Sequence, residues 1–215
     1  LKESTGIKEL DECLGGGLLR PSLTYVKGTT GSGKTTLALN FLMEGVNNDI
    51  PVVYICPSEK IPVGNPILCN CIHENHNLLN IHTVAPWECL PSPLMTLYNI
   101  DKVIQTTGAK RVVIDDVDKL LYTMSRDDMY MFMRNLAHYI KSLGITSMVL
   151  SGSAVTDKTL IELMESLSDN LIHITYDIKN GKERRTLQIL KSTGGHKTEE
   201  CVFEITKTGI DIKET

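Results

Sequence analysis

Residues 28–36 read Gly-Thr-Thr-Gly-Ser-Gly-Lys-Thr-Thr, an uninterrupted match to the pattern G-x-x-x-x-G-K-[ST]. The glycines give the backbone the freedom to turn successive N–H groups toward phosphate oxygens. An apolar run at 23–26 precedes this loop, and a helical pattern at 36–45 follows it. Phosphates held there lie at a helix N-terminus, where the dipole and unpaired amides favour anions. The pattern therefore predicts a strand–loop–helix unit that binds a nucleoside triphosphate.

The loop positions have distinct predicted roles. Lys34 brings a positive charge to the β- and γ-phosphates, which makes it a candidate catalytic residue. The Thr35 hydroxyl is placed to bind Mg²⁺. The residues predicted to contact the nucleotide are Thr29, Thr30, Gly31, Ser32, Gly33, Lys34, Thr35 and Thr36.

A short strand pattern at 111–114 is followed directly by Asp115 and Asp116. A triphosphate site needs an acidic partner for Mg²⁺ at the carboxyl end of a strand, as in a Walker B element. Asp115 is the predicted metal ligand, either directly or through a water molecule. Asp116 is predicted to be a neighbouring polar group or an aid to the catalytic base.

Apolar runs alternate with amphipathic stretches along most of the chain. The predicted strands lie at 23–26, 52–56, 81–84, 111–114 and 146–151, and the predicted helices at 35–45, about 94–107, 127–143 and 159–166. Most of the strand runs are rich in β-branched residues, which is typical of strands buried on both faces of a parallel sheet. The alternation predicts an α/β fold, with a mainly parallel sheet flanked by helices.

The last third of the chain has a different character. Runs at 171–177 and 184–191 predict a hairpin that turns near Asn180-Gly181. Two further short strands are predicted at 201–206 and 210–213. An antiparallel hairpin and meander should therefore close one edge of the α/β core.

Length and composition fit one soluble domain that covers residues 1–215. The chain has 41% hydrophobic and 22% charged residues, and its formal net charge of −4 gives no overall attraction for nucleic acid or anionic membranes. No apolar stretch approaches the ~20 residues of a transmembrane helix. We therefore expect a cytoplasmic protein without membrane insertion.

Cysteine usage is scattered, so most of the six cysteines are expected to be small buried hydrophobic residues. A group of soft and borderline metal ligands leaves two interpretations open, namely a zinc site or variable loop residues. The group consists of Cys69, Cys71, His73 and His76, with Cys89 further along the chain. Its spacing is not that of a standard zinc finger.

Four stretches together resemble the KaiC-like branch of the RecA-superfamily P-loop ATPases. They are residues 4–18, the loop at 28–36, residues 108–115 and the stretch 185–210. The first and last are more discriminating than the loop, which many folds share. The resemblance implies a RecA-like core with ATP and Mg²⁺ as cofactors. It also implies a homo-oligomer, such as a hexameric ring, with ATP between neighbouring subunits.

The chain departs from this family at two catalytic positions. The family usually carries two adjacent Glu residues after the strand at 52–56, whereas this chain has Ser58 and Glu59. Family members also present a Lys and, two residues later, an Arg to the neighbour's ATP; here Lys191 is kept and Thr193 takes the second place. Glu59 and, in trans, Lys191 remain the catalytic candidates. These changes predict tight ATP binding with slow hydrolysis.

Three functions stay open. The first is an oligomeric ATP-dependent switch, and the second is a recombinase-like DNA-binding ATPase. The third is a non-hydrolysing scaffold that ATP assembles for an unidentified protein partner. DNA binding is disfavoured, because the segment 151–165 is short and acidic and no Lys/Arg cluster with interleaved aromatic residues is present.

Overall fold

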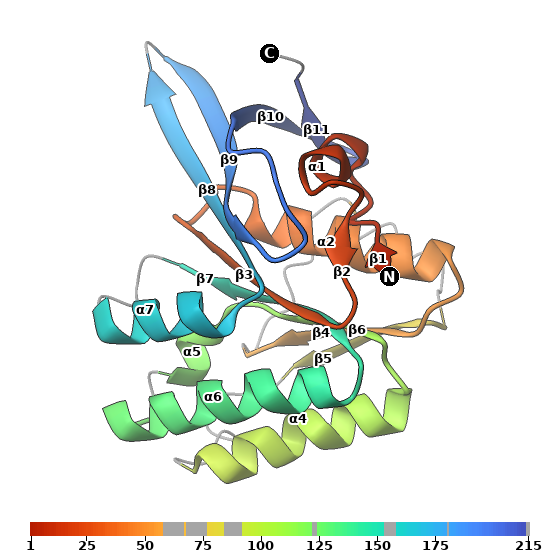
Figure 1. Cartoon of the computed structure of the whole chain (residues 1–215), viewed down its shortest axis with the longest axis vertical. Helices are drawn as coiled ribbons and strands as arrows, with labels where there is room; N and C mark the ends of the chain where they lie inside the picture. The colour runs from red at the N-terminus through yellow and green to blue at the C-terminus, as the bar shows by residue number, and fades with distance from the viewer. Residues whose placement is uncertain are drawn as a thin grey trace.

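The computed structural model describes residues 1–57, 67, 77–83, 92–121, 124–152, 158–179 and 181–213 (Figure 1). Within these residues, nine strands form one sheet in the order β11-β10-β9-β8-β3-β7-β6-β4-β5. The strands are β3 (Ser22–Gly28), β4 (Val52–Cys56), β5 (Leu79–Thr83), β6 (Arg111–Ile114), β7 (Thr146–Ser151), β8 (Asn170–Lys179), β9 (Lys182–Ser192), β10 (Glu200–Thr206) and β11 (Gly209–Ile212). The run from β8 to β5 is parallel, and β9, β10 and β11 extend it antiparallel. The predicted α/β fold with a C-terminal antiparallel meander is confirmed.

Helices cover both faces of the sheet (Figure 1). One face carries α1 (Lys8–Cys13) and α2 (Lys34–Asn47), and the other carries α4 (Pro93–Thr107), α5 (Val117–Leu121), α6 (Arg126–Ser142) and α7 (Lys158–Leu167). Successive residues of β4 pack on opposite faces of the sheet: Tyr54 packs on the α2 side, and Val53 and Ile55 pack on the other side. This two-sided burial explains why the strand runs are almost continuously apolar.

The strands at 52–56, 111–114 and 146–151 have the predicted bounds. The strand predicted at 81–84 lies at Leu79–Thr83, and the one predicted at 23–26 extends to Gly28 and includes the first residue of the glycine-rich loop. None of the helices in the described part of the chain is long and apolar enough to cross a membrane.

The N-terminal segment contains elements that the sequence did not predict. Two strands of two residues each, β1 (Lys2–Glu3) and β2 (Leu18–Leu19), pair with each other. In the sequence, β1 precedes α1 and β2 follows it. A buried arginine fastens this segment to the core. Arg111, the first residue of β6, donates hydrogen bonds to the carbonyls of Ser4 (3.0 Å) and Phe41 (2.7 Å), and its Nε lies 3.8 Å from a Glu3 carboxylate oxygen.

Candidate functional site: a phosphate-binding loop and an acidic partner

The glycine-rich loop connects β3 to α2, and its first residue lies directly beside β8 in the sheet. A Cβ atom on Gly28 would lie only 2.3 Å from the backbone oxygen of Ile174, so this close approach requires glycine. Gly33 is the N-cap residue of α2 and has φ of 110°, a left-handed conformation that favours glycine. The loop therefore leads directly into the N-terminus of α2, where backbone N–H groups lack partners within the helix. This is the geometry of an anion-binding site.

Two predicted metal ligands meet beside this helix N-terminus. The Thr35 hydroxyl donates a hydrogen bond of 2.6 Å to Oδ2 of Asp115, which also accepts a bond of 2.7 Å from the Tyr54 hydroxyl. Asp115 is 8% exposed, so its carboxylate is held in a defined position at the carboxyl end of β6. A hydroxyl and a carboxylate are the hard oxygen ligands that Mg²⁺ prefers. Burial raises the pKa of Tyr54, so its hydroxyl stays a donor to the carboxylate.

The Lys34 ammonium lies within the loop itself. Its Nζ donates to the backbone oxygens of Gly28 (2.7 Å) and Thr29 (3.0 Å). Burial lowers the pKa of Lys34, while the charges of nearby aspartates act in the opposite direction. A positive charge held in a partly desolvated loop is suited to binding an anion.

The residues around the loop are suited to a bound triphosphate and metal. A cavity of about 210 Å³ is lined by Lys34, Thr35, Tyr54, Asp115 and Asp116, among others. Beside it, the Ser32 hydroxyl is fully buried and has no hydrogen-bond partner among the described residues. A buried hydroxyl without a partner is costly, and a phosphate oxygen is one group that would satisfy it.

The C-terminal meander lies against the same loop. A Cβ on Gly33 would lie 3.2 Å from a side-chain carbon of Ile205 and 3.3 Å from one of Phe203, so β10 packs on the start of α2. Arg185 on β9 donates from Nε to the Gly31 oxygen at 3.4 Å, and its guanidinium stacks over Tyr176 at 4.6 Å. Arg185 was not among the predicted site residues. The sequence gives little indication of a role for Arg185, because its position near the loop depends on the register between β8 and β9.

Lys191 and Thr193, at the end of β9, lie away from the loop of their own chain. The Lys191 ammonium donates to backbone oxygens at the C-terminus of α7, at 2.7 Å to Ser168 and 3.0 Å to Glu165. A cation is favourable there because of the helix dipole. The Thr193 N–H donates to the Asp169 oxygen at 3.0 Å. A role for Lys191 in a neighbouring subunit stays a prediction.

Ser58 and Glu59 lie outside the described residues, as do Cys69, Cys71, His73, His76 and Cys89. The predicted base and the zinc interpretation therefore both stay predictions.

A buried carboxylate that the sequence did not single out lies next to the site. Asp118 is 1% exposed; its oxygens accept bonds from the Ser151 hydroxyl (2.6 Å) and the Gly152 N–H (2.9 Å). Its own N–H donates to Asp116 at 2.8 Å. Burial raises the pKa of Asp118 to about 6, and the charge of Asp116 acts in the same direction. Asp118 thereby joins the ends of β6 and β7 beside the cavity.

This raised pKa predicts a specific pH dependence of stability. An acid whose pKa is higher in the folded state favours folding when protonated, so its contribution is lost as the pH rises from 3.8 to about 6. The Asp118→Asn variant keeps an acceptor for the Gly152 N–H, and its amide does not titrate. Relative to this variant, the wild type should lose roughly 3 kcal/mol of unfolding free energy across this range. Urea unfolding of both proteins without metal or nucleotide measures the difference, and parallel pH curves would contradict the prediction.

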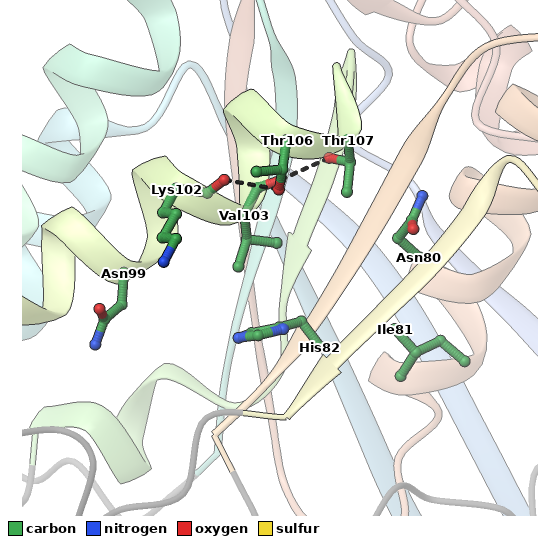
Figure 2. Close-up of a pocket in the computed structure, with 8 residues that line it drawn as sticks. All are labelled: Asn80, Ile81, His82, Asn99, Lys102, Val103, Thr106 and Thr107. Carbon is green, nitrogen blue, oxygen red and sulfur yellow. Dashed lines mark hydrogen bonds between the residues drawn. The ribbon is translucent and has the colours of Figure 1, made fainter.

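A separate cavity lies between α4 and β5, the strand at the edge of the sheet (Figure 2). It measures about 470 Å³, and the figure shows His82 on β5 pointing toward Val103 on α4. The nearby threonine hydroxyls bond to carbonyls of their own helix. This larger cavity is remote from the glycine-rich loop and contains none of the predicted nucleotide ligands.

A parallel sheet, a glycine-rich loop before the first long helix and an acidic residue at the end of β6 define a RecA-like P-loop nucleotide-binding protein. The sequence matches the family model described as "ATPase: KaiC" over residues 3–75 and 92–215. The chain therefore belongs to the KaiC ATPase family, which confirms the resemblance found in the sequence.

Individual relatives with 26–29% sequence identity support this assignment. A UPF0273 protein of Thermotoga maritima is 28% identical over 232 residues, which cover 97% of this chain and 94% of that protein. The circadian clock oscillator protein KaiC of Prochlorococcus marinus subsp. pastoris is 29% identical over 98% of this chain and 45% of its own length. The circadian clock protein KaiC2 of Synechocystis is 26% identical over 99% of this chain and 40% of its own length. The chain thus spans less than half of either clock protein.

Proposed function

We propose that residues 1–215 act as a single domain that binds ATP with Mg²⁺, hydrolyses it slowly and uses it as an oligomeric switch. The observation that carries the proposal is the hydrogen bond of 2.6 Å between Thr35 and Asp115 at the N-terminus of α2. It brings together a hydroxyl from the phosphate-binding loop and a strand-end carboxylate, the pair that binds Mg²⁺ in P-loop NTPases.

The proposed binding roles follow from the described contacts. The backbone N–H groups of residues 29–36 bind phosphate oxygens, and the Lys34 ammonium exchanges its carbonyl partners for the β- and γ-phosphates. Thr35 and Asp115 hold the metal, with Tyr54 fixing the carboxylate. When bound, Mg²⁺ would supply positive charge that offsets charge on the phosphates.

The proposed slow hydrolysis rests on the residues that stand at the family's catalytic positions in this sequence. Ser58 is not a carboxylate base, which leaves Glu59 as the candidate and puts roughly 10²–10⁴-fold of base assistance at risk. Thr193 stands where the family commonly has an arginine, and such arginines can contribute about 10³–10⁵ in rate. Lys191 alone offers a single charge without bidentate bonding. We therefore expect this protein to bind ATP tightly and to hydrolyse it slowly.

Self-association is the remaining part of the proposal. Lys191 lies at the end of β9 and contacts α7 of its own chain, so a role in ATP turnover requires a second copy. An ATP-assembled scaffold for a protein partner differs from the switch only in the absence of turnover. DNA binding is the less favoured function, because the net charge is −4 and the sequence has no Lys/Arg cluster with interleaved aromatic residues.

Three measurements on one preparation test these functions together. We expect the solution mass to increase with Mg²⁺-ATP, phosphate release to stay below about 1 s⁻¹, and single-stranded DNA to leave both unchanged. Faster turnover would contradict the proposed slow hydrolysis. An unchanged mass would contradict the switch, and salt-dependent binding of DNA would favour the recombinase-like function. No measurable turnover together with an increased mass would favour the scaffold.

A further inference from the structure

Two cysteine side chains from opposite ends of the chain are in contact. Cys13 is the last residue of α1, and Cys201 lies in β10, 188 residues further along. Their Sγ atoms are 4.0 Å apart, and both residues are partly exposed. Of the cysteines that the structure describes, only Cys56 is buried, so the expectation of mostly buried cysteines fails for this pair.

The backbone holds the two cysteines close together. The N–H of Lys197, just before β10, donates to the Cys13 oxygen at 2.9 Å. Both cysteines also pack against the hydrophobic core on the α2 side of the sheet. Figure 1 shows α1 near β10, in agreement with the contact between the two sulfur atoms. The contact between the sulfur atoms therefore belongs to a packed junction between the N-terminal segment and the meander.

We propose that Cys13 and Cys201 are an oxidation site that forms an intramolecular disulfide. A disulfide bond is about 2.05 Å long, so the two sulfur atoms must approach by roughly 2 Å. The junction lies at the end of a six-residue helix and near the start of a strand, where side-chain rotation and small shifts can provide this movement. Partial exposure lets a small oxidant reach the sulfur atoms.

The oxidant is a low-molecular-weight disulfide such as oxidised glutathione. One protein thiolate attacks a glutathione sulfur, which forms a mixed disulfide and releases one glutathione thiolate. The second cysteine then attacks the protein sulfur of the mixed disulfide and releases the second glutathione. The two cysteines lose two protons and two electrons in total, and two molecules of reduced glutathione are formed.

The bond would tie the first segment of the chain to its last sheet strands. In the chain-entropy account, cross-links that close long loops stabilise the folded state most, and this loop covers 188 residues. β10 also carries Phe203 and Ile205, which pack on Gly33 at the start of α2. The disulfide would therefore fasten the strand that covers the phosphate-binding loop. This inference goes beyond the proposed function and does not depend on nucleotide binding.

Peptide mapping of the full chain tests the pair directly. Burial and the neighbouring Cys13 thiol raise the pKa of Cys201 to about 11, so exchange is slow at neutral pH. Reduced protein is therefore incubated with oxidised glutathione at about pH 8.5, near the ordinary thiol pKa. Trypsin then yields peptides 9–27 and 198–207, each with a single cysteine. Mass spectrometry should find them joined, about 2 Da lighter than their sum.

Variants and stability provide an independent readout. The oxidised wild type should run as a monomer on a non-reducing gel, because the disulfide is intramolecular. Its urea unfolding midpoint should rise by about 1 M or more on oxidation and fall again with dithiothreitol. Cys13→Ser and Cys201→Ser should each lose the linked peptide and the shift, while Cys89→Ser should keep both. Peptides that stay unlinked, carry only glutathione, or pair with another cysteine or another chain would overturn the proposal.

Discussion

Replacing Lys34 with alanine is expected to weaken binding of Mg²⁺-ATP by about 10- to 100-fold. Hydrogen bonds to charged groups are worth about 1.5–3 kcal/mol, and the ammonium is the positive charge that the loop itself supplies to the phosphates. The loop should remain folded, since the hydrogen bonds of Lys34 to the described residues go to the carbonyls of Gly28 and Thr29, and burial already disfavours its charged form. Isothermal titration of both proteins with ATP and Mg²⁺ gives the ratio of affinities.

Lys8→Ala is the matched control for loss of a lysine. Lys8 is 84% exposed on α1, and its contact with Glu12 spans 4.0 Å, so neither ATP affinity nor stability should change measurably. If Lys34→Ala and Lys8→Ala bind ATP equally well while both remain folded, the loop does not bind the phosphates in the proposed way.

Replacing Arg111 with methionine should lower the free energy of unfolding by about 3 kcal/mol. Arg111 is 3% exposed, stacks over Phe41 at 4.7 Å and donates to two backbone carbonyls. Its loss also leaves the Glu3 carboxylate, which is buried, with one cation fewer. Breaking such a buried pair costs about 3–5 kcal/mol. The low end applies because Arg20 still lies 3.3 Å from Glu3.

A double variant separates charge loss from packing loss. Glu3→Gln combined with Arg111→Met should be less destabilised than the sum of the single variants, with a coupling of about 1–2 kcal/mol. Arg184→Met is the control, because Arg184 is about half exposed in its pair with Glu200 and should change stability by less than about 0.5 kcal/mol. Urea unfolding of the wild type, the two single variants, the double variant and Arg184→Met measures these changes. Strict additivity would show that the Glu3–Arg111 pair does not stabilise the fold.

The central part of the fold was predictable because it is buried on both faces. The strands at Val52–Cys56 and Arg111–Ile114 have uniformly apolar or β-branched interiors, and their bounds follow from where that character ends. The meeting of Thr35 with Asp115 also follows from the sequence. Both residues come after strands of a parallel sheet, whose carboxyl ends share one edge.

Features that depend on non-local contacts were missed. The strands β1 and β2 have two residues each, which is too short for any period to show. Asp118 acquires its partners only because β6 and β7 are neighbours, so that the residues after Ile114 and Val149 lie side by side. The contact between Cys13 and Cys201 depends on α1 and β10 packing together across most of the chain. Sequence patterns carry no information on such pairs until the fold is known.

The metal dependence of ATP affinity tests the central claim most directly. Titration of the wild type with ATP should give binding at least about tenfold tighter with Mg²⁺ than with a chelator, equivalent to about 1.4 kcal/mol. Asp115→Asn should abolish most of this difference, whereas Asp211→Asn, at an exposed carboxylate paired with Lys213, should retain it. Equal affinities with and without Mg²⁺ in the wild type, or an unchanged difference in Asp115→Asn, would contradict the account.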